Sequence, residues 1–398
     1  MTMYLTKLEK ISRAGLRQTC ARLMGSMGVA ALLVAAHTCA LAQDIVVGQV
    51  ASMSGTNGAD LGQGLQQGLR LAIEKANAAG GIGGKKLRLV VKDDQYVPDE
   101  TVRLTKELIE QDKPIALAGY RGTANTMALI KSELLTQNNI ALVGTLTGAK
   151  EVQGAPNIYH VRTSYQNEIG QIVEQLSRMS ISRIALFYVD DAFGKSGREA
   201  VENALSAQGR KPAATAAYDK TADQVIPTIE KAVQTLVAAQ PQAVIIVAVG
   251  DPVYEFVKRF RKASPSPRLV SISVVNPDAV VKQVGNSTAQ GIGFSQVFPF
   301  PYNDTVRLVR EYRSLMKKYS PDTQPNYFSL EGYVSGLVLI QAIKKAGNNP
   351  TREKVMDALN KMPETDLGGF FVKFDAKSHN GSKFTELTVL AADGKLKR

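Results

Sequence analysis

Two glycine-containing segments of this chain come close to nucleotide-binding motifs, but each lacks one of the residues that the motif requires. The segment 62–68 carries glycines after a predicted strand, as a dinucleotide-binding loop does, but Gln67 stands where G-x-G-x-x-G needs its third glycine. The segment 194–196 reads Gly-Lys-Ser, the end of a phosphate-binding loop, but Val189 replaces the first glycine of that loop. These glycines are therefore predicted to serve turns and close packing.

Side chains that bind metals are scarce. After residue 42 the chain has two histidines, His160 and His379, and no cysteine. The acidic pairs at 93–94 and 190–191 each follow a predicted strand, where carboxylates commonly cap the next turn or helix. Neither pair supplies the roughly six to eight oxygen ligands that a calcium ion takes. We expect no metal and no cofactor.

A nucleophilic serine also lacks its usual context. The pattern G-x-S-x-G does not occur, because Ser335 is one residue out of place in the segment 332–336, which lies in a predicted helix. A serine triad needs a histidine, and His160 falls in an apolar predicted strand, where a packed histidine is commoner than a general base. The sequence therefore favours a binding protein over an enzyme. A hydrolase that uses His160 or Ser335 is the alternative.

The first 42 residues have the order of an export signal. A basic stretch precedes an apolar run at 23–36, and Ala40-Leu41-Ala42 provides small residues where a signal peptidase cleaves. The apolar run is shorter than the ~20 residues of a membrane-spanning helix. We predict cleavage after residue 42 and a soluble, exported product. Both cysteines, Cys20 and Cys39, would leave with the signal.

Charge and composition argue against nucleic acid as a partner. Removing five basic residues and one acidic residue with the signal lowers the formal net charge from +12 to +8. The remaining lysines and arginines are spread out, without a basic stripe interleaved with aromatic residues. We expect a mild preference for anionic ligands instead.

Apolar runs typical of buried strands alternate with helical patterns from residue 45 onward. Strands are predicted at 45–50, 87–91, 115–118 and 140–143, with helices at 61–79, 99–111 and 127–135 between them. The alternation then restarts, with strands at 184–189, 213–218, 243–249 and 269–275 and helices near 197–207, 222–239 and after Pro252. Helices follow at 305–318, 328–345 and 351–361, and two last strands at 370–374 and 386–390 flank a turn.

This order predicts an α/β fold with two doubly wound parallel-sheet lobes. Ligands of such sheets bind at the carboxyl ends of the strands, and domain junctions concentrate pockets. The loops expected to matter are those that follow strands, at 51–60, 119–125, 144–150, 190–195 and 250–254.

Several stretches resemble the type I periplasmic solute-binding proteins, and within them the leucine/isoleucine/valine-binding group that feeds ABC importers. The stretches that carry the resemblance are residues 45–55, the glycine-rich turn at 78–87, the acidic pair at 93–94 and the later segments 184–194, 290–292 and 331–333.

The resemblance implies two lobes joined by three hinge crossovers that close on a small solute. It places one lobe at 44–163 plus 295–380 and the other at 164–294 plus 381–398. It also implies an ABC permease as partner and a monomeric protein. A sensory module of the same fold is the rival interpretation.

The resemblance further implies which residues contact the ligand. The loop at 122–125 matches the site that holds a ligand carboxylate with a hydroxyl and backbone N–H groups, so Thr123 is the leading candidate. Arg121, beside that loop, adds positive charge. The full set of candidate ligand contacts is Ser54, Thr123, Ala124, Leu146, Thr147, Gly148, Phe193, Asp251 and Phe328, of which Asp251 is a hypothesis outside the family pattern.

One departure from the family pattern bears on the ligand. Branched-chain binders hold the ligand's α-ammonium group with an acidic residue, and the matching segment here, 273–276, reads Ser-Val-Val-Asn. Asp251 on a neighbouring loop is a hypothetical substitute. The expected ligand is a small carboxylate-bearing solute, a branched-chain or other amino acid. An amine-free aromatic or keto acid is the alternative.

Overall fold

The computed structural model describes residues 44–55, 58–221 and 223–398, so the predicted export signal lies outside the described residues. Residues 44–398 form one compact unit. In the described part of the chain, no helix is long and apolar enough to cross a membrane.

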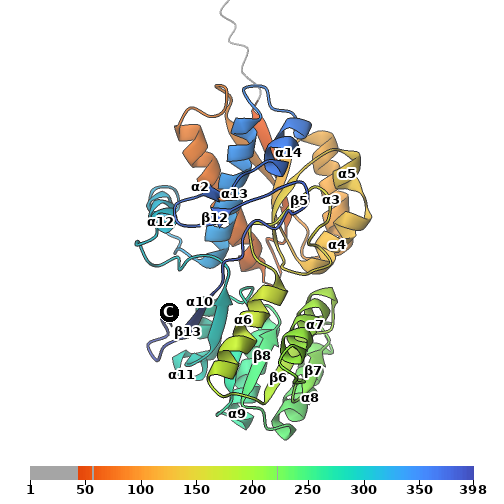
Figure 1. Ribbon diagram of the computed structural model, residues 1–398, viewed down its shortest axis with the longest axis vertical. Helices are drawn as coiled ribbons and strands as arrows, with labels where there is room; N and C mark the ends of the chain where they lie inside the picture. The colour runs from red at the N-terminus through yellow and green to blue at the C-terminus, as the bar shows by residue number, and fades with distance from the viewer. Residues whose placement is uncertain (1–43, 56–57, 222) are drawn as a thin grey trace, which may run out of the picture. The chain divides into compact units, whose positions relative to one another are not determined.

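The first sheet is parallel and has five strands in the order β2-β1-β3-β4-β5. Its strands are β1 (Ile45–Ala51), β2 (Leu87–Asp93), β3 (Ala116–Arg121), β4 (Leu142–Leu146) and β5 (Ile158–Tyr159). Its helices are α2 (Ala59–Ala78), α3 (Pro98–Gln111), α4 (Thr123–Lys131), α5 (Leu134–Gln137), α12 (Arg307–Tyr319), α13 (Tyr327–Lys345) and α14 (Arg352–Asn360). Figure 1 shows α2 and α13 on one side of this sheet and α3, α4 and α5 on the other. Both faces are covered, which explains why β1, β3 and β4 are buried throughout.

The second sheet has seven strands in the order β14-β13-β10-β9-β8-β6-β7. Its strands are β6 (Ile184–Val189), β7 (Thr215–Tyr218), β8 (Ala243–Val247), β9 (Arg268–Ser271), β10 (Gly293–Gln296), β13 (Glu386–Leu390) and β14 (Leu396–Lys397). The strands from β7 to β10 run parallel, and β13 and β14 add antiparallel pairs at one edge. The helices of this part are α6 (Tyr165–Arg178), α7 (Ala192–Ser206), α8 (Val225–Ala238), α9 (Asp251–Ala263), α10 (Pro277–Val284) and α11 (Asn286–Ala289).

The glycines of segment 62–68 serve close packing, as predicted. A Cβ atom on Gly68 of α2 would overlap the carbonyl oxygen of Ser329 at the start of α13. A Cβ on Gly62 would overlap the carbonyl oxygen of Ser52, the residue that follows β1. Because glycine lets backbones approach this closely, α2 can lie directly against both elements.

Several predicted elements differ from the structure. The predicted helix at 127–135 is two helices, because Glu133 adopts a left-handed φ of 57° that ends α4 before α5 begins. The predicted helix at 197–207 begins earlier, at Ala192, where the Asp191 side chain caps it by accepting from the Gly194 N–H at 3.1 Å. The last two predicted strands do not pair with each other: β12 (Phe371–Val372) pairs with β11 (Thr365–Asp366), and β13 joins the second sheet.

The lobe limits implied by the resemblance stay a prediction. The limit between residues 294 and 295 falls inside β10, which pairs with β9 and β13 of the second sheet.

Candidate functional site

A small cavity lies where loops at the carboxyl ends of strands from both sheets meet. From the first sheet it is lined by Leu61, Tyr96, Arg121, Gly122, Thr123 and Leu146, and from the second by Tyr165, Phe193, Val249 and Val274. Its volume is about 10 Å³, close to the minimum of ~10–15 Å³ that one water molecule needs. Any solute can therefore enter only if the walls move apart.

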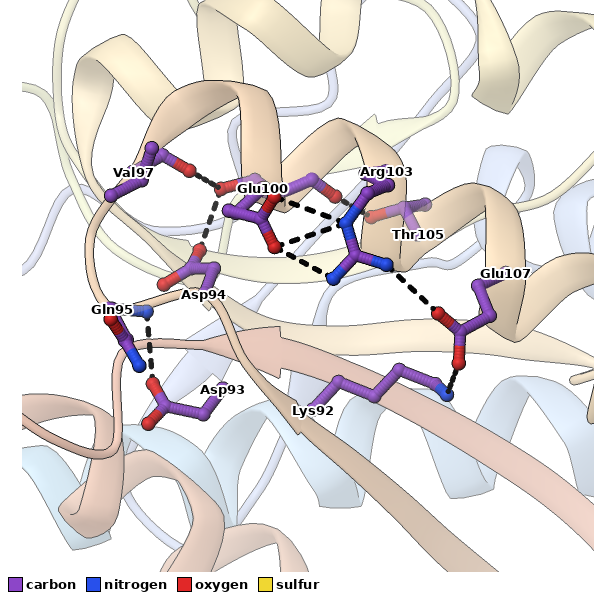
Figure 2. Close-up of polar contacts among 10 residues, drawn as sticks. Lys92, Asp93, Asp94, Gln95, Val97, Glu100, Arg103, Thr105 and Glu107 are labelled. Atoms are coloured by element: carbon purple, nitrogen blue, oxygen red, sulfur yellow. Dashed lines mark hydrogen bonds and ion pairs between the residues drawn. The ribbon is translucent and has the colours of Figure 1, made fainter.

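The turn after β2 brings Tyr96 to the cavity. Gln95 and Tyr96 both have left-handed φ values, 50° and 65°, and Asp93 and Asp94 stabilise this turn by accepting from their backbone N–H groups at 2.9 Å each. The Asp94 carboxylate also accepts from the Thr101 hydroxyl at 2.6 Å, which ties the turn to the first part of α3. Figure 2 shows the Asp94 side chain facing α3 and Asp93 beside Gln95. The acidic pair is thus a turn-building element, as its position after a strand predicted.

Charged side chains also fix α3 to β2. Glu107 of α3 pairs with Lys92 of β2 at 2.7 Å and with Arg103 at 3.2 Å, and Glu100 also binds Arg103 (Figure 2). These contacts hold α3 in place behind the Tyr96 turn. They lie on the surface, so each contributes little energy by itself.

Arg121, the last residue of β3, is the charged residue of the cavity wall. It is 2% exposed, and its guanidinium carbon lies 4.3 Å from the centre of the Tyr96 ring, in cation–π geometry. Its Nη1 donates to the Ser52 hydroxyl. Burial lowers the pKa of Arg121, against the opposing influence of Tyr96, Asp94 and Asp60. Burial likewise raises the pKa of Tyr96 to about 12, and the Arg121 charge opposes that rise.

Helix α4 begins at the cavity. Gly122 precedes it with φ 91°, and a Cβ there would lie 2.6 Å from the Tyr96 ring, so glycine is required for this close approach. Thr123 is the first residue of the helix, and its hydroxyl lies 2.7 Å from the Thr147 hydroxyl. The first N–H groups of a helix have no partner within the helix and favour negative charge.

The second sheet contributes an apolar and aromatic wall. Phe193 of α7 and Tyr165 of α6 have ring centres 5.5 Å apart, and Val249 and Val274 follow β8 and β9. Burial raises the pKa of Tyr165, so its hydroxyl stays neutral near pH 7.

Three of the nine candidate ligand contacts line this cavity, namely Thr123, Leu146 and Phe193. Thr147 adjoins the lining through its hydrogen bond to Thr123, and Ala124 follows in the first turn of α4.

The structure places the other four elsewhere. Gly148 accepts a backbone hydrogen bond from Tyr165 at 2.8 Å, behind the wall. Ser54 is exposed and donates to Asp93 at 2.6 Å, while Phe328 is buried between α13 and α2, beside Gly64. Asp251 is exposed and lines a separate depression with Asp60 and Asn276. Ligand contact at all nine positions stays a prediction.

Five residues of the cavity, Leu61, Tyr96, Tyr165, Val249 and Val274, were missed from the sequence as ligand contacts. Leu61, Tyr165, Val249 and Val274 read only as members of apolar or helical patterns. Tyr96 follows a strand end marked by two acids, and this signal could have identified it, because loops after parallel strands carry binding residues.

The residues considered for catalysis are packed inside the protein. His160 is fully buried, with Nδ1 3.0 Å from the Thr145 hydroxyl, and burial lowers its pKa to about 4. Ser335 is also fully buried and donates to the Glu331 carbonyl at 2.9 Å. Across the described ranges, no three His, Cys, Asp or Glu side chains gather in a way that could hold a metal ion.

A second buried arginine, Arg162, lies outside the cavity, between β5 and α6. It is 1% exposed and forms ion pairs with Glu168 of α6 at 3.7 Å and with Glu331 of α13 at 3.8 Å. Its Nη2 also donates to the hydroxyl of Ser273, which in turn donates to Glu168 at 3.0 Å. Burial raises the pKa of Glu331 to about 7 although the Arg162 charge opposes that rise. Because α13 packs on the first sheet and α6 contacts β10 of the second, this cluster connects the two sheets.

Comparisons with known proteins agree with this architecture. The family described as periplasmic binding protein matches residues 44–395. An amino acid binding protein from Pseudomonas aeruginosa is 24% identical over 332 residues, which is 81% of this chain and 85% of that protein. Leu/Ile/Val-binding protein homolog 7 from Brucella melitensis is 23% identical over 390 residues, 93% of this chain and 94% of that protein.

Among solved structures, a substrate-binding periplasmic protein from Ralstonia solanacearum is similar to this chain. The TM-score is 0.83 with 32% identity, and the match covers 89% of this chain and 99% of that one. The predicted α/β fold with two parallel-sheet lobes is thereby confirmed, and so is the resemblance noted in the sequence. The chain belongs to the periplasmic binding protein family, in the type I group that includes the leucine/isoleucine/valine-binding proteins.

Proposed function

We propose that this protein is the periplasmic solute-binding component of an ABC importer and that it binds a small carboxylate-bearing solute in the cavity around Arg121. The observation that carries the proposal is the composition of the cavity wall, in which a buried guanidinium and the start of α4 face apolar side chains from the second sheet. A guanidinium and free N–H groups at a helix start both favour a carboxylate. The apolar wall suits the rest of a small organic acid.

A role of this protein in transport agrees with its family and with the names of two relatives. The relative from Pseudomonas aeruginosa is named for amino acid binding and the one from Brucella melitensis for leucine, isoleucine and valine. Amino acids are therefore the first solutes to test. The protein binds and releases its solute without chemical change, as a member of a solute-binding family is expected to do.

The proposed mechanism is a movement of the part of the chain built on the first sheet against the part built on the second sheet. The cavity is too small for a solute, and its walls come from loops of both sheets, so separating the sheets opens it. Asn276 donates to Asp60 at 2.9 Å across the same junction, a contact that opening would break. A solute that contacts both walls would shift the population toward the closed arrangement.

Isothermal titration of refolded protein lacking residues 1–42 tests this proposal, with leucine, glutamate, phenylalanine and benzoate as ligands. We expect saturable binding of at least one of them, and refolding removes any solute carried through purification. Absence of saturable binding by all four would contradict the proposal. A pull-down from membrane extract then distinguishes a transporter from a sensor: recovery of an ABC permease supports import, and recovery of a receptor contradicts it.

The Phe193→Ala variant tests how much the apolar wall from the second sheet contributes to affinity for the solute. We expect a loss of affinity of about tenfold or more, because Phe193 reaches the solute only when the walls come together. The matched control is Phe256→Ala, which removes a fully buried ring stacked at 3.9 Å on Phe187 and should cost about 3–5 kcal/mol of unfolding free energy. If Phe193→Ala destabilises the fold as much as this control does, Phe193 is a core residue and not a ligand contact.

A further inference from the structure

The cations on the helices around the second sheet differ in their partners. Several of them pair with a carboxylate one turn away on the same helix, as Arg178 of α6 does with Glu174 at 2.6 Å. Arg261 and Lys262, in the last turn of α9, have no carboxylate within ion-pair distance among the described residues. The negative end of the helix dipole amounts to only about half an elementary charge, so it does not neutralise two cations.

Arg261 is held in place by the loop that follows α9. Its Nη1 donates to the carbonyl oxygen of Pro265 at 2.7 Å and to that of Pro267 at 2.9 Å. The side chain is half-buried, and burial lowers the pKa of Arg261. Its Nε and Nη2 donate to no acceptor in the described part of the chain, so these N–H groups can donate to an anion.

The Arg261 side chain lines a depression between α9 and α11. Lys258 and Lys262 line it from α9, and Ser287 and Thr288 line it from α11, which contacts α9 (Figure 1). The volume of the depression is about 470 Å³, within the ~300–1,000 Å³ of small-ligand sites. No aspartate or glutamate belongs to its described lining. The depression therefore combines positive charge with hydroxyl donors.

This depression is separate from the cavity that Arg121 lines. Helix α9 begins at Asp251, soon after the carboxyl end of β8, and runs back along the sheet to Ala263. Its 13 residues span about 20 Å at ~1.5 Å per residue. Because the strand β9 begins at Arg268, shortly after the end of α9, the depression lies at the amino ends of the strands. The cavity lies at their carboxyl ends.

We propose that the depression between α9 and α11 binds a phosphate group, with Arg261 and Lys262 as its counter-ions. A phosphate group brings about one to two negative charges and several strong acceptor oxygens. It can therefore accept from a guanidinium, from ammonium groups and from hydroxyls at the same time. The group belongs either to a free phosphate compound or to a phospholipid headgroup, since both present the same oxygens.

Two sets of binding experiments distinguish these sources, using protein that lacks residues 1–42. Isothermal titration with inorganic phosphate and with glycerol 3-phosphate tests the free compounds. Co-flotation with phosphatidylglycerol vesicles tests the lipid headgroup, with net-neutral phosphatidylcholine vesicles as the reference. We expect saturable binding in at least one of the two sets. Absence of binding in both sets, or equal binding to the two kinds of vesicle without binding of the free compounds, overturns the inference.

The double variant Arg261→Gln/Lys262→Gln tests the two counter-ions. Its matched control is Arg178→Gln/Lys231→Gln, which removes the same net charge from exposed positions on α6 and α8. We expect the first double variant to weaken phosphate binding about tenfold or more, because charge-assisted hydrogen bonds are lost, and the control to leave it unchanged. Equal weakening by both would show that binding follows net charge, and the site would be overturned.

Lys262→Gln alone keeps the test decisive if the double variant does not fold, because Arg261 also holds the loop at Pro265. We expect a severalfold loss of phosphate affinity with unchanged urea unfolding, and Lys231→Gln is the control. A loss of stability with unchanged affinity would show that Lys262 serves only the end of α9, and would overturn its role as a counter-ion. The proposed function is unaffected by either result, because the solute cavity is a different site.

Discussion

Arg121 and Arg162 are equally buried, at 2% and 1% exposure, but their surroundings differ. Arg162 is enclosed by two glutamates, and their charges raise its pKa against the lowering effect of burial. Arg121 faces a cavity without a carboxylate in its described lining, and burial lowers its pKa. The difference shows that one residue type can lie in two settings: Arg162 is enclosed by anions of the fold, whereas Arg121 is part of a cavity wall.

The largest expected effect comes from removing each arginine in turn. Arg162→Met leaves Glu168 and Glu331 buried together without their cation, so we expect the unfolding free energy to fall by about 3–5 kcal/mol. Arg121→Met removes a cation whose neighbouring acids have other donors, so we expect a smaller loss of about 1–2 kcal/mol, for the buried hydrogen bond to Ser52 and the contact with the Tyr96 ring. Urea unfolding of both variants measures the difference.

Equal losses for the two variants would remove the distinction between a structural and a ligand-facing arginine. If Arg162→Met does not fold, Arg162→Lys keeps the positive charge, and its loss should still exceed that of Arg121→Lys. The methionine pair and the lysine pair each place the same residue at positions 121 and 162. A difference in unfolding free energy within a pair therefore reflects the surroundings of the two positions.

The second prediction concerns the pH dependence that comes from Glu331, which pairs with Arg162. The pKa of Glu331 rises from its ordinary 4.5 to about 7 because burial outweighs the Arg162 charge. The folded protein therefore holds this proton more tightly than the unfolded chain. The stability that Glu331 contributes is fully present below about pH 4.5 and is lost as the pH rises to about 7, by on the order of 3 kcal/mol.

Glu331→Gln should remove this loss. The unfolding free energy of the variant relative to the wild type should rise by on the order of 3 kcal/mol between pH 4.5 and 7.5. Glu364→Gln, at an exposed position, is the control and should show a constant difference. A constant difference for Glu331→Gln as well would show that Glu331 ionises as it does in the unfolded chain.

The sequence predicted the elements better than the contacts between them. The boundaries of β1, β2 and β6 were predicted to within two residues, because strands buried on both faces read as continuous apolar runs. The start of α7 was missed because its first turn, at Phe193, faces the cavity and does not continue the helical pattern of the residues after 197. Local patterns therefore fail where a residue serves the site and not the core.

The same limit applies to the two arginines. Arg121 was noted from the sequence because it adjoins the loop at 122–125, which follows a strand. The Arg162 cluster could not be predicted, because Glu331 lies far along the chain on α13 and reaches Arg162 only through the packing of that helix on the first sheet. Tyr96 was missed for a related reason: its position depends on a left-handed turn that the Asp93–Asp94 carboxylates stabilise.

The smallest expected effect compares the serines that bind the two arginines. Ser273 accepts from Arg162 and donates to Glu168, whereas Ser52 accepts from Arg121. Both serines are buried, so Ser→Ala removes hydrogen bonds that water cannot replace. We expect Ser273→Ala to lower the unfolding free energy by about 2 kcal/mol without changing affinity for the solute. Ser52→Ala should lower it by only about 1 kcal/mol.

Affinity is the readout that distinguishes the two serines. Without Ser52 the guanidinium of Arg121 loses the hydrogen bond that its Nη1 donates, so its orientation broadens. Binding of the carboxylate should then weaken severalfold, since a two-point hydrogen bond depends on the angle of the fork. Titration calorimetry and urea unfolding of both variants measure the two quantities side by side. If Ser273→Ala weakens binding more than Ser52→Ala does, the Arg162 cluster controls the movement that admits the solute, and it is then more than a structural ion pair.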